Sequence, residues 1–209
     1  MAAGYRMKNT LKAGLAALVL AFTLLVTSGG VSFAQDFQKG LEAAQKGDFA
    51  TALREWGPLA QQGNAQAQYN LGWQYDAGLI VTQDYKEAVK WYRKSAEQGN
   101  AQAQHGLGWV YTNGAGVIQD YKEAVKWYRK SAEQGYAAAQ TGLGLMYHRG
   151  QGVIQDDVYA HMWFNIAASL GGVMSTWYRD RVAERMTASD ISKAQKLARE
   201  CVRKNYKGC

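Results

Sequence analysis

The sequence predicts an all-α protein, a solenoid in which antiparallel helix pairs are stacked and closed by helical caps. Segments recur with a spacing of 36 residues, and each contains two stretches whose apolar residues have helical spacing. Glycine is frequent, at 23 of 209 residues, and there is a single proline, which favours helices separated by glycine turns. One helix pair cannot bury both of its apolar faces, so the repeats are expected to stack.

The first 34 residues are expected to be a secretory signal peptide. Three basic residues and no acidic residue open the chain, and an apolar run follows at 13–26. Ser32 and Ala34 then stand three and one residues before a cleavage point ahead of Gln35. This order of basic, apolar and small residues is typical of a signal peptide cut between Ala34 and Gln35.

Two alternatives for this segment stay open. A retained membrane anchor is less favoured, because the apolar run is too short to span a bilayer well. Met7 is an alternative start, since it begins a signal peptide equally well. No cysteine lies near the cut, so a lipoprotein anchor is not expected. The mature protein is therefore expected in the periplasm or secreted, with membrane contact only in transit.

Residues 35–64 are interpreted as a degenerate N-terminal helix pair. A short first helix is expected near 37–46. The second follows Gly47-Asp48-Phe49 and contains Trp56. This pair lacks most of the residues that recur later in the chain.

Three repeats are assigned to 65–100, 101–136 and 137–172. The columns that recur in all three are Leu71, Leu107 and Leu143; Gly72, Gly108 and Gly144; Tyr75, Tyr111 and Tyr147; Asp84, Asp120 and Asp156; and Trp91, Trp127 and Trp163. So many positions in one register predict one supersecondary unit for each copy.

The first helix of each repeat is expected near 65–77 and its equivalents. Ala67, Leu71 and Tyr75 fall on one face at helical spacing. Gly78, like Gly114 and Gly150 in the later copies, is expected to end the helix in the left-handed conformation.

The second helix is expected near 84–98. Asp84 is the expected N-cap, and Glu87 three residues later predicts the reciprocal capping box, which Asp120 and Glu123 repeat. Its expected buried stripe consists of Ala88, Trp91, Tyr92 and Ala96.

Residues 173–209 are expected to form C-terminal capping helices. Thr187 is the predicted N-cap of the last helix. Cys201 and Cys209 are the only cysteines and lie in the last nine residues. In an oxidising compartment such a pair is best interpreted as a disulfide, contributing about 2–3 kcal/mol, rather than as a redox site, because a CxxC spacing is absent.

The repeated string Ala-x-Ala-Gln-x-x-Leu-Gly-x-x-Tyr, followed by Ala-x-x-Trp-Tyr-x-Lys-x-Ala-Glu-Gln-Gly, resembles the Sel-one-like repeat, a relative of the tetratricopeptide repeat. The resemblance covers about 65–170, and the closing segment is similar to that of many bacterial members. One departure is Ile80, where the other copies have Gly116 and Gly152. The resemblance implies a right-handed superhelix whose first helices line a concave face that binds a partner. It implies an adaptor, although a few exported relatives with cysteine pairs in every repeat are associated with β-lactams.

The tetratricopeptide-like arrangement selects the groove residues. They are Gln66, Tyr69, Trp73, Asp76, Gln102, His105, Trp109, Thr112, Ala138, Thr141, Leu145 and His148, with Arg149 beside them. Trp73 and Trp109 are interpreted either as anchors for a peptide or as packing between neighbouring first helices. Both interpretations stay open at this point.

A comparison within the chain favours the same face. Residues 83–99 and 119–135 are identical at all 17 positions, whereas 65–81 and 101–117 agree at 10 of 17. Divergence is thus concentrated on the first helix, as expected of a surface tuned for recognition, although uneven drift would have the same effect.

Charge and motifs exclude several other classes. Beyond the signal peptide, residues 176–209 carry a net charge of +5 and residues 35–175 a net charge of −1. Because the excess is confined to one end, nucleic-acid binding is not expected. The sequence shows no motif for a nucleophile, a metal or a phosphate loop, so neither a cofactor nor catalysis is expected. The three histidines lack metal-ligand spacing.

The predicted function is that of an exported adaptor that binds a protein or peptide partner in the cell envelope through its concave face. The alternative is a cell-wall hydrolase or β-lactam-binding protein. A basic ridge on the second helices, which includes Lys90, Arg93 and Lys94, is a lesser candidate surface.

Overall fold

The computed structural model describes residues 34, 36–78 and 82–209. The expected signal peptide, except Ala34, and Ile80 lie outside the described residues. The described chain divides into two compact units, with the boundary between Leu59 and Ala60. Its regular secondary structure is helical, which confirms the all-α prediction for these residues. None of the described helices has the length and apolar character needed to cross a membrane.

The first unit contains the N-terminal helix pair. Residues 36–45 are helical, and α2 spans Phe49–Gln61. Trp56 in α2 is buried and packs on Gly40 so closely that no Cβ would fit there. Its indole Nε1 donates to the carbonyl of Phe37 at 3.2 Å. One tryptophan therefore joins the two helices by both packing and a hydrogen bond.

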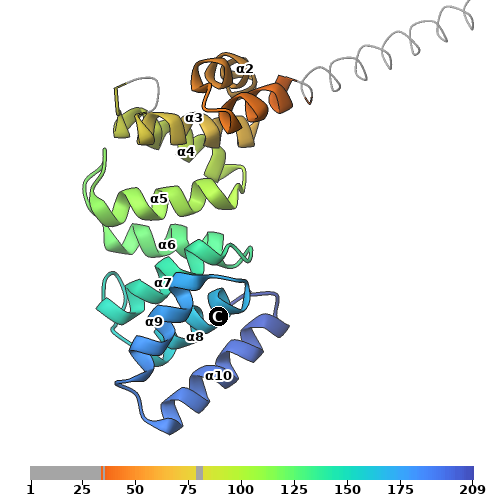
Figure 1. Cartoon of the computed structure of the whole chain (residues 1–209). Helices are drawn as coiled ribbons and strands as arrows, with labels where there is room; N and C mark the ends of the chain where they lie inside the picture. The colour runs from red at the N-terminus through yellow and green to blue at the C-terminus, as the bar shows by residue number, and fades with distance from the viewer. Residues whose placement is uncertain (1–33, 35, 79–81) are drawn as a thin grey trace, which may run out of the picture. The chain divides into compact units, whose positions relative to one another are not determined.

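The second unit contains the repeats and the C-terminal helices (Figure 1). Its helices are α3 (Ala65–Ala77), α4 (Tyr85–Glu97), α5 (Ala101–Asn113), α6 (Tyr121–Ala132), α7 (Ala137–Arg149), α8 (Asp157–Ser169), α9 (Val173–Ala183) and α10 (Ala188–Arg203). From α3 to α9 each helix packs on the next, and α5 also contacts α7. Consecutive antiparallel pairs with neighbouring first helices are the arrangement of an α-solenoid.

The helix ends largely follow the sequence. Gly78, Gly114 and Gly150 have φ of 64°, 68° and 66°, so each ends its helix in the left-handed region as predicted. Thr187 caps α10 by accepting the backbone N–H of Asp190 at 3.1 Å.

The predicted reciprocal capping box is only half present. The Asp84 carboxylate accepts the N–H of Glu87 at 3.0 Å, as expected. The predicted return bond, from the N–H of Asp84 to the Glu87 side chain, is wrong. That N–H donates instead to the carbonyl of Tyr75 at 3.0 Å. The Glu87 carboxylate instead pairs with Lys90 at 2.7 Å. A carbonyl in the last turn of α3 thus takes the donor that the capping box needs.

The core of each of the first two repeats is built on an aromatic ring between two glycines. Tyr92 in α4 lies between Gly72 of α3 and Gly106 of α5, where an added Cβ would be 2.6 Å and 3.2 Å from the ring. Tyr128 has the same relation to Gly108 and Gly142, at 2.5 Å and 2.8 Å. Glycine at these positions lets neighbouring first helices close over the ring.

Most of the predicted stripe of the second helix is buried, but its tryptophan differs between copies. Ala88, Tyr92 and Ala96 are buried. Trp91 is only partly buried, whereas Trp127 is 7 % exposed in a cluster with Ala88 and other residues of α4 and α5. The second helices of the first two repeats thus have the same sequence, but their tryptophans are buried to different degrees by the neighbouring helices.

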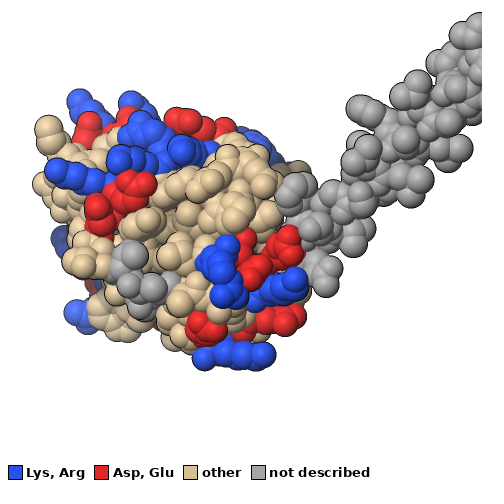
Figure 2. All heavy atoms as spheres, turned by 90° about the horizontal axis from the view of Figure 1, so that it is seen from above, with Lys and Arg blue, Asp and Glu red and all other residues tan. Residues whose placement is uncertain are grey.

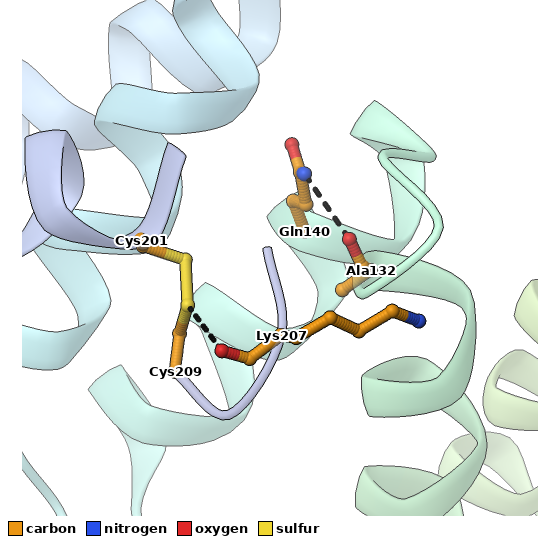
Figure 3. The surroundings of a disulfide bond; sticks show 5 residues. All are labelled: Ala132, Gln140, Cys201, Lys207 and Cys209. Atoms are coloured by element: carbon orange, nitrogen blue, oxygen red, sulfur yellow. Dashed lines mark hydrogen bonds between the residues drawn. A yellow bond between two sulfur atoms is a disulfide. The ribbon is translucent and has the colours of Figure 1, made fainter. Parts of the chain in front are cut away.

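The C-terminal helices α9 and α10 both pack on α8. Cys201 and Cys209 form a disulfide with their Cα atoms 5.6 Å apart. Figure 3 shows the disulfide and Lys207 in the tail that it closes. This tail returns to the α6–α7 turn, where an added Cβ on Gly135 would be 3.0 Å from the ring of Tyr206. Tyr206 has φ of 65°, an unusual conformation for a non-glycine residue, and its N–H donates to the carbonyl of Cys201 at 2.9 Å.

Candidate functional site

The first helices of the repeats lie side by side and present one continuous surface, which we call the first-helix face. It comprises the predicted groove positions on α3, α5 and α7. Side chains link its helices, since Gln66 Nε2 donates to Gln102 Oε1 at 3.1 Å. Thr141 Oγ1 and Ser175 Oγ are 2.7 Å apart, so α9 continues the same face.

Gln66 and Gln102 hold neighbouring repeats together. Gln66 also receives a hydrogen bond from Asn100 Nδ2 at 3.0 Å and donates to Asn70 Oδ1 at 3.3 Å. Their amides are therefore largely engaged within the protein, and these predicted groove residues act first as links between helices.

Tyr69 and His105 occupy equivalent positions and both pack into the interior edge of the face. The ring of Tyr69 stacks on Tyr92, with centroids 5.9 Å apart. His105 lies between Tyr128 and Tyr136, at 5.7 Å and 5.4 Å. Burial lowers the pKa of His105 to about 4, so its imidazole is neutral near pH 7. An aromatic pocket of this kind does not leave His105 as a metal ligand.

Asp76 and Thr112 lie beside the hydroxyl groups of buried tyrosines. Tyr92 donates to Asp76 Oδ2 at 2.9 Å, and Tyr128 lies beside Thr112, whose own hydroxyl donates to the carbonyl of Gly108 at 2.8 Å. Burial raises the pKa of Asp76, and the bond from Tyr92 partly opposes that rise. The hydroxyls reach these residues because Gly72 and its equivalent allow the rings to approach the first helices so closely.

Trp73 and Trp109 are the large apolar side chains of these helices that remain accessible. Each is 39 % exposed, and they lie at equivalent positions on neighbouring first helices. Trp109 also packs against Tyr85, with centroids 6.2 Å apart. Trp109 therefore packs on a second helix while part of its ring stays exposed, and the role of these tryptophans as anchors for a peptide stays a prediction.

In the third repeat the predicted residues are mostly engaged. Leu145 packs against the cluster formed by Ala160, Phe164 and Val182. His148 Nδ1 is 2.7 Å from a carboxylate oxygen of Asp157. Ala138 and Arg149 are exposed. This part of the face differs chemically from the tryptophan-bearing first two copies.

The sequence analysis missed the contribution of α9 to this face. Val173, Met174 and Ser175 join Ala138 and Thr141 around a cleft of about 400 Å³. Val173 and Met174 are exposed. The available signal was Gly171-Gly172 followed by an apolar helix start, which resembles the turn before each first helix.

The face carries few charged groups that could perform chemistry. Within the described ranges, no three His, Cys, Asp or Glu side chains lie close enough together to hold a metal ion. Figure 2 shows basic and acidic side chains intermingled around uncharged surface in the view it presents. The arrangement suits apolar and hydrogen-bonding contacts with another molecule.

Known proteins share this architecture. The Sel1 repeat model matches residues 65–100, 101–136 and 137–172. The structure is similar to c5321, a protective antigen of uropathogenic Escherichia coli with an SLR fold, at 28 % identity and a TM-score of 0.59 over 83 % of this chain. It covers 47 % of c5321, so it spans about half of that protein. A Sel1 repeat protein from Oxalobacter formigenes is 35 % identical with a TM-score of 0.56, over 62 % of this chain and 98 % of that protein. No curated protein sequence matches.

Proposed function

We propose that this chain, which belongs to the Sel1 repeat family, is an exported scaffold that binds a protein or peptide partner on its first-helix face. Proteins of this family generally act as scaffolds for protein–protein interactions. The observation that carries the proposal is the pair Trp73 and Trp109, which stay 39 % exposed on neighbouring helices whose other groove residues are engaged within the fold. Half-exposed aromatic side chains on a rigid surface are typical binding hot spots.

Rigidity of the surrounding face favours this use. The links from Gln66 to Gln102 and from Thr141 to Ser175 fix the lateral spacing of the first helices. A face that is already ordered loses little conformational entropy when a partner binds. An extended or helical segment laid across these helices would meet both tryptophans and then the α7–α9 cleft.

Two features support export. The basic, apolar and small-residue order of the first 34 residues is that of a signal peptide. The Cys201–Cys209 disulfide is of the kind that persists in oxidising compartments. The bacterial origin of the similar structures is in keeping with a periplasmic or secreted protein.

The hydrolase alternative gains no support. The relatives on which it rests carry cysteine pairs in each repeat, whereas both cysteines here lie beyond the repeats. Turnover of nitrocefin by the purified protein would restore that alternative.

The test is partner capture by the protein purified from a bacterial envelope, immobilised and exposed to envelope extract. The variant Trp73→Ala/Trp109→Ala is compared with Ile118→Ala/Ile154→Ala, which removes two loop side chains that are 91 % and 89 % exposed. Captured proteins are identified by mass spectrometry, and affinity is then measured with the purified partner. Each hot-spot tryptophan is expected to be worth about 2 kcal/mol, so the double variant should bind at least about 100-fold more weakly.

The isoleucine variant should bind as the wild type does. Circular dichroism checks that both variants keep their helices. Equal binding by the wild type and the tryptophan variant would show that the first-helix face is not the working surface.

A further inference from the structure

A second cleft lies between α8 and α10, on residues that the first-helix face does not use. It has a volume of about 640 Å³. Ile166 of α8 and Ala198 of α10 are buried at its floor, and Val202, 44 % exposed, forms one apolar wall. Small-molecule sites are typically apolar clefts of about 300–1,000 Å³ with a few well-placed polar groups.

Cationic side chains line this cleft along one edge. Lys196, Arg199 and Arg203 follow one another at helical spacing on α10, next to the row of Ala198 and Val202. All three are exposed, and in the part of the chain that the structure describes none of them forms an ion pair.

The dipole of α10 explains the presence of only one of these three cations. Arg203 is in the last turn of α10, where a cation is favoured by the helix dipole. Lys196 and Arg199 lie further from that end, where the effect has faded. Glu200 also lines the cleft but pairs with none of the cations, so the edge keeps an excess of positive charge.

We propose that the α8–α10 cleft binds a single-chain anionic lipid, a fatty-acid carboxylate in the simplest case. The acyl chain lies on Ile166, Ala198 and Val202, and the carboxylate lies against Lys196 and Arg199. The cleft presents far fewer side chains than the roughly 20–30 residues a side of a stable protein interface, so it suits one acyl chain better than a partner helix. Charge complementarity selects an anion over a neutral or cationic amphiphile.

The test is a fluorescence titration of the purified protein with dansylaminoundecanoic acid below its micellar concentration, followed by competition. Dodecanoate should displace the probe, whereas dodecyltrimethylammonium, with the same chain length and opposite charge, should not. Lys196→Gln/Arg199→Gln should weaken probe binding by about fivefold to tenfold, as expected for two partly solvated ion pairs. Val202→Asp, which places a carboxylate on the apolar wall, should reduce binding further.

Lys86→Gln/Lys122→Gln is the matched control, since it removes the same charge from two exposed lysines on the second helices. This control should bind the probe within about twofold of the wild type, and so should Trp73→Ala/Trp109→Ala, because neither change touches the cleft. Circular dichroism confirms that all variants fold.

Several results would overturn the proposal. They are equal displacement by the cationic and anionic amphiphiles, full affinity in the Lys196/Arg199 variant, and no binding to the wild type. Probe binding lost in the Trp73/Trp109 variant alone would place the lipid on the first-helix face and equally contradict it. None of these results bears on partner capture, so the scaffold proposal is judged separately.

Discussion

Tyr92 lies so close to Gly72 that a Cβ on this glycine would be 2.6 Å from ring atom Cδ1. Glycine inside a helix costs about 1 kcal/mol relative to alanine. The close approach explains why that cost is tolerated, since the ring fills the space that a side chain would occupy. Its hydroxyl can then reach Asp76 on the first-helix face.

Gly72→Ala is therefore expected to destabilise the protein by about 1–3 kcal/mol, because the gain in helix propensity is outweighed by overpacking against Tyr92. Urea unfolding followed by circular dichroism measures the change. Gly106→Ala is the comparison, since its added Cβ would be 3.2 Å from the same Tyr92 ring and should therefore cost less. If Gly72→Ala cost no more than Gly106→Ala, close packing would not explain the glycine.

Tyr92→Phe should cost more than Tyr128→Phe at neutral pH. The first change removes a bond to a half-buried carboxylate, worth about 1.5–3 kcal/mol, whereas the second removes a contact with the neutral Thr112, worth about 1 kcal/mol at most. The pKa of Asp76 should rise further in Tyr92→Phe, because that bond lowers it. Protonating Asp76 removes the uncompensated charge, so the stability deficit should shrink as pH falls.

Unfolding measurements on both variants between pH 7 and pH 3, with the Asp76 pKa followed by NMR, check this. A deficit in Tyr92→Phe that stayed constant with pH would show that the hydroxyl does not act through the carboxylate.

Folding stability should depend on His105 below about pH 6.5. Burial lowers the pKa of His105 to about 4 from a usual value of 6.5, so between these values the unfolded chain binds a proton that the folded chain does not. Stability is therefore lost as pH falls from about 6.5 to about 4, by up to about 3 kcal/mol. His105→Phe, which keeps a ring between Tyr128 and Tyr136, should abolish this part of the pH dependence.

Denaturation of the wild type and His105→Phe at pH 7, 5.5 and 4.5 gives the comparison. Parallel stability curves for the two proteins would contradict a neutral, buried His105.

Reduction of the disulfide, or Cys209→Ser, should lower the free energy of unfolding by about 2–3 kcal/mol, the chain-entropy value for so short a loop. It should also release Tyr206 from Gly135 and the α6–α7 turn. Limited trypsin digestion read by mass spectrometry should show faster cleavage after Lys204 and Lys207 once the bridge is opened, with little change elsewhere. Unchanged cleavage at these lysines would show that the tail is held without the bridge.

The fold was largely predictable because local signals decide it. Gly78 and Thr187 ended and began helices where expected, since one residue supplies the required backbone conformation or cap. Glu87 was misassigned because the N–H of Asp84 donates instead to the carbonyl of Tyr75, near the end of α3. A local motif does not report such a competitor.

The candidate face was less predictable than the fold. Helical register places Gln66, Tyr69 and Trp73 near one another, but register alone does not give the distance to the neighbouring helix. That distance lets Gln66 bond to Gln102 and leaves Trp73 accessible. The part played by Ser175 was missed because α9 shares only the preceding glycine turn with the first helices and lacks their other recurring residues. It joins the face through packing on α8 and the contact with Thr141.

Residues 83–99 and 119–135 are identical, so deleting one whole repeat between them would leave the sequence at the new junction unchanged. In a chain lacking residues 83–118, α3 would be followed by α6 in place of α4, and the two helices have the same sequence. Tyr128 would then pack on Gly72 as Tyr92 does now. α7 would follow unchanged. Recombination between the two copies would then shorten or lengthen the array by one intact module, and each step would remove or add one tryptophan of the first-helix face. After the deletion α7 would neighbour α3 in place of α5, so Ala138 would take the position of Gln102 beside Gln66.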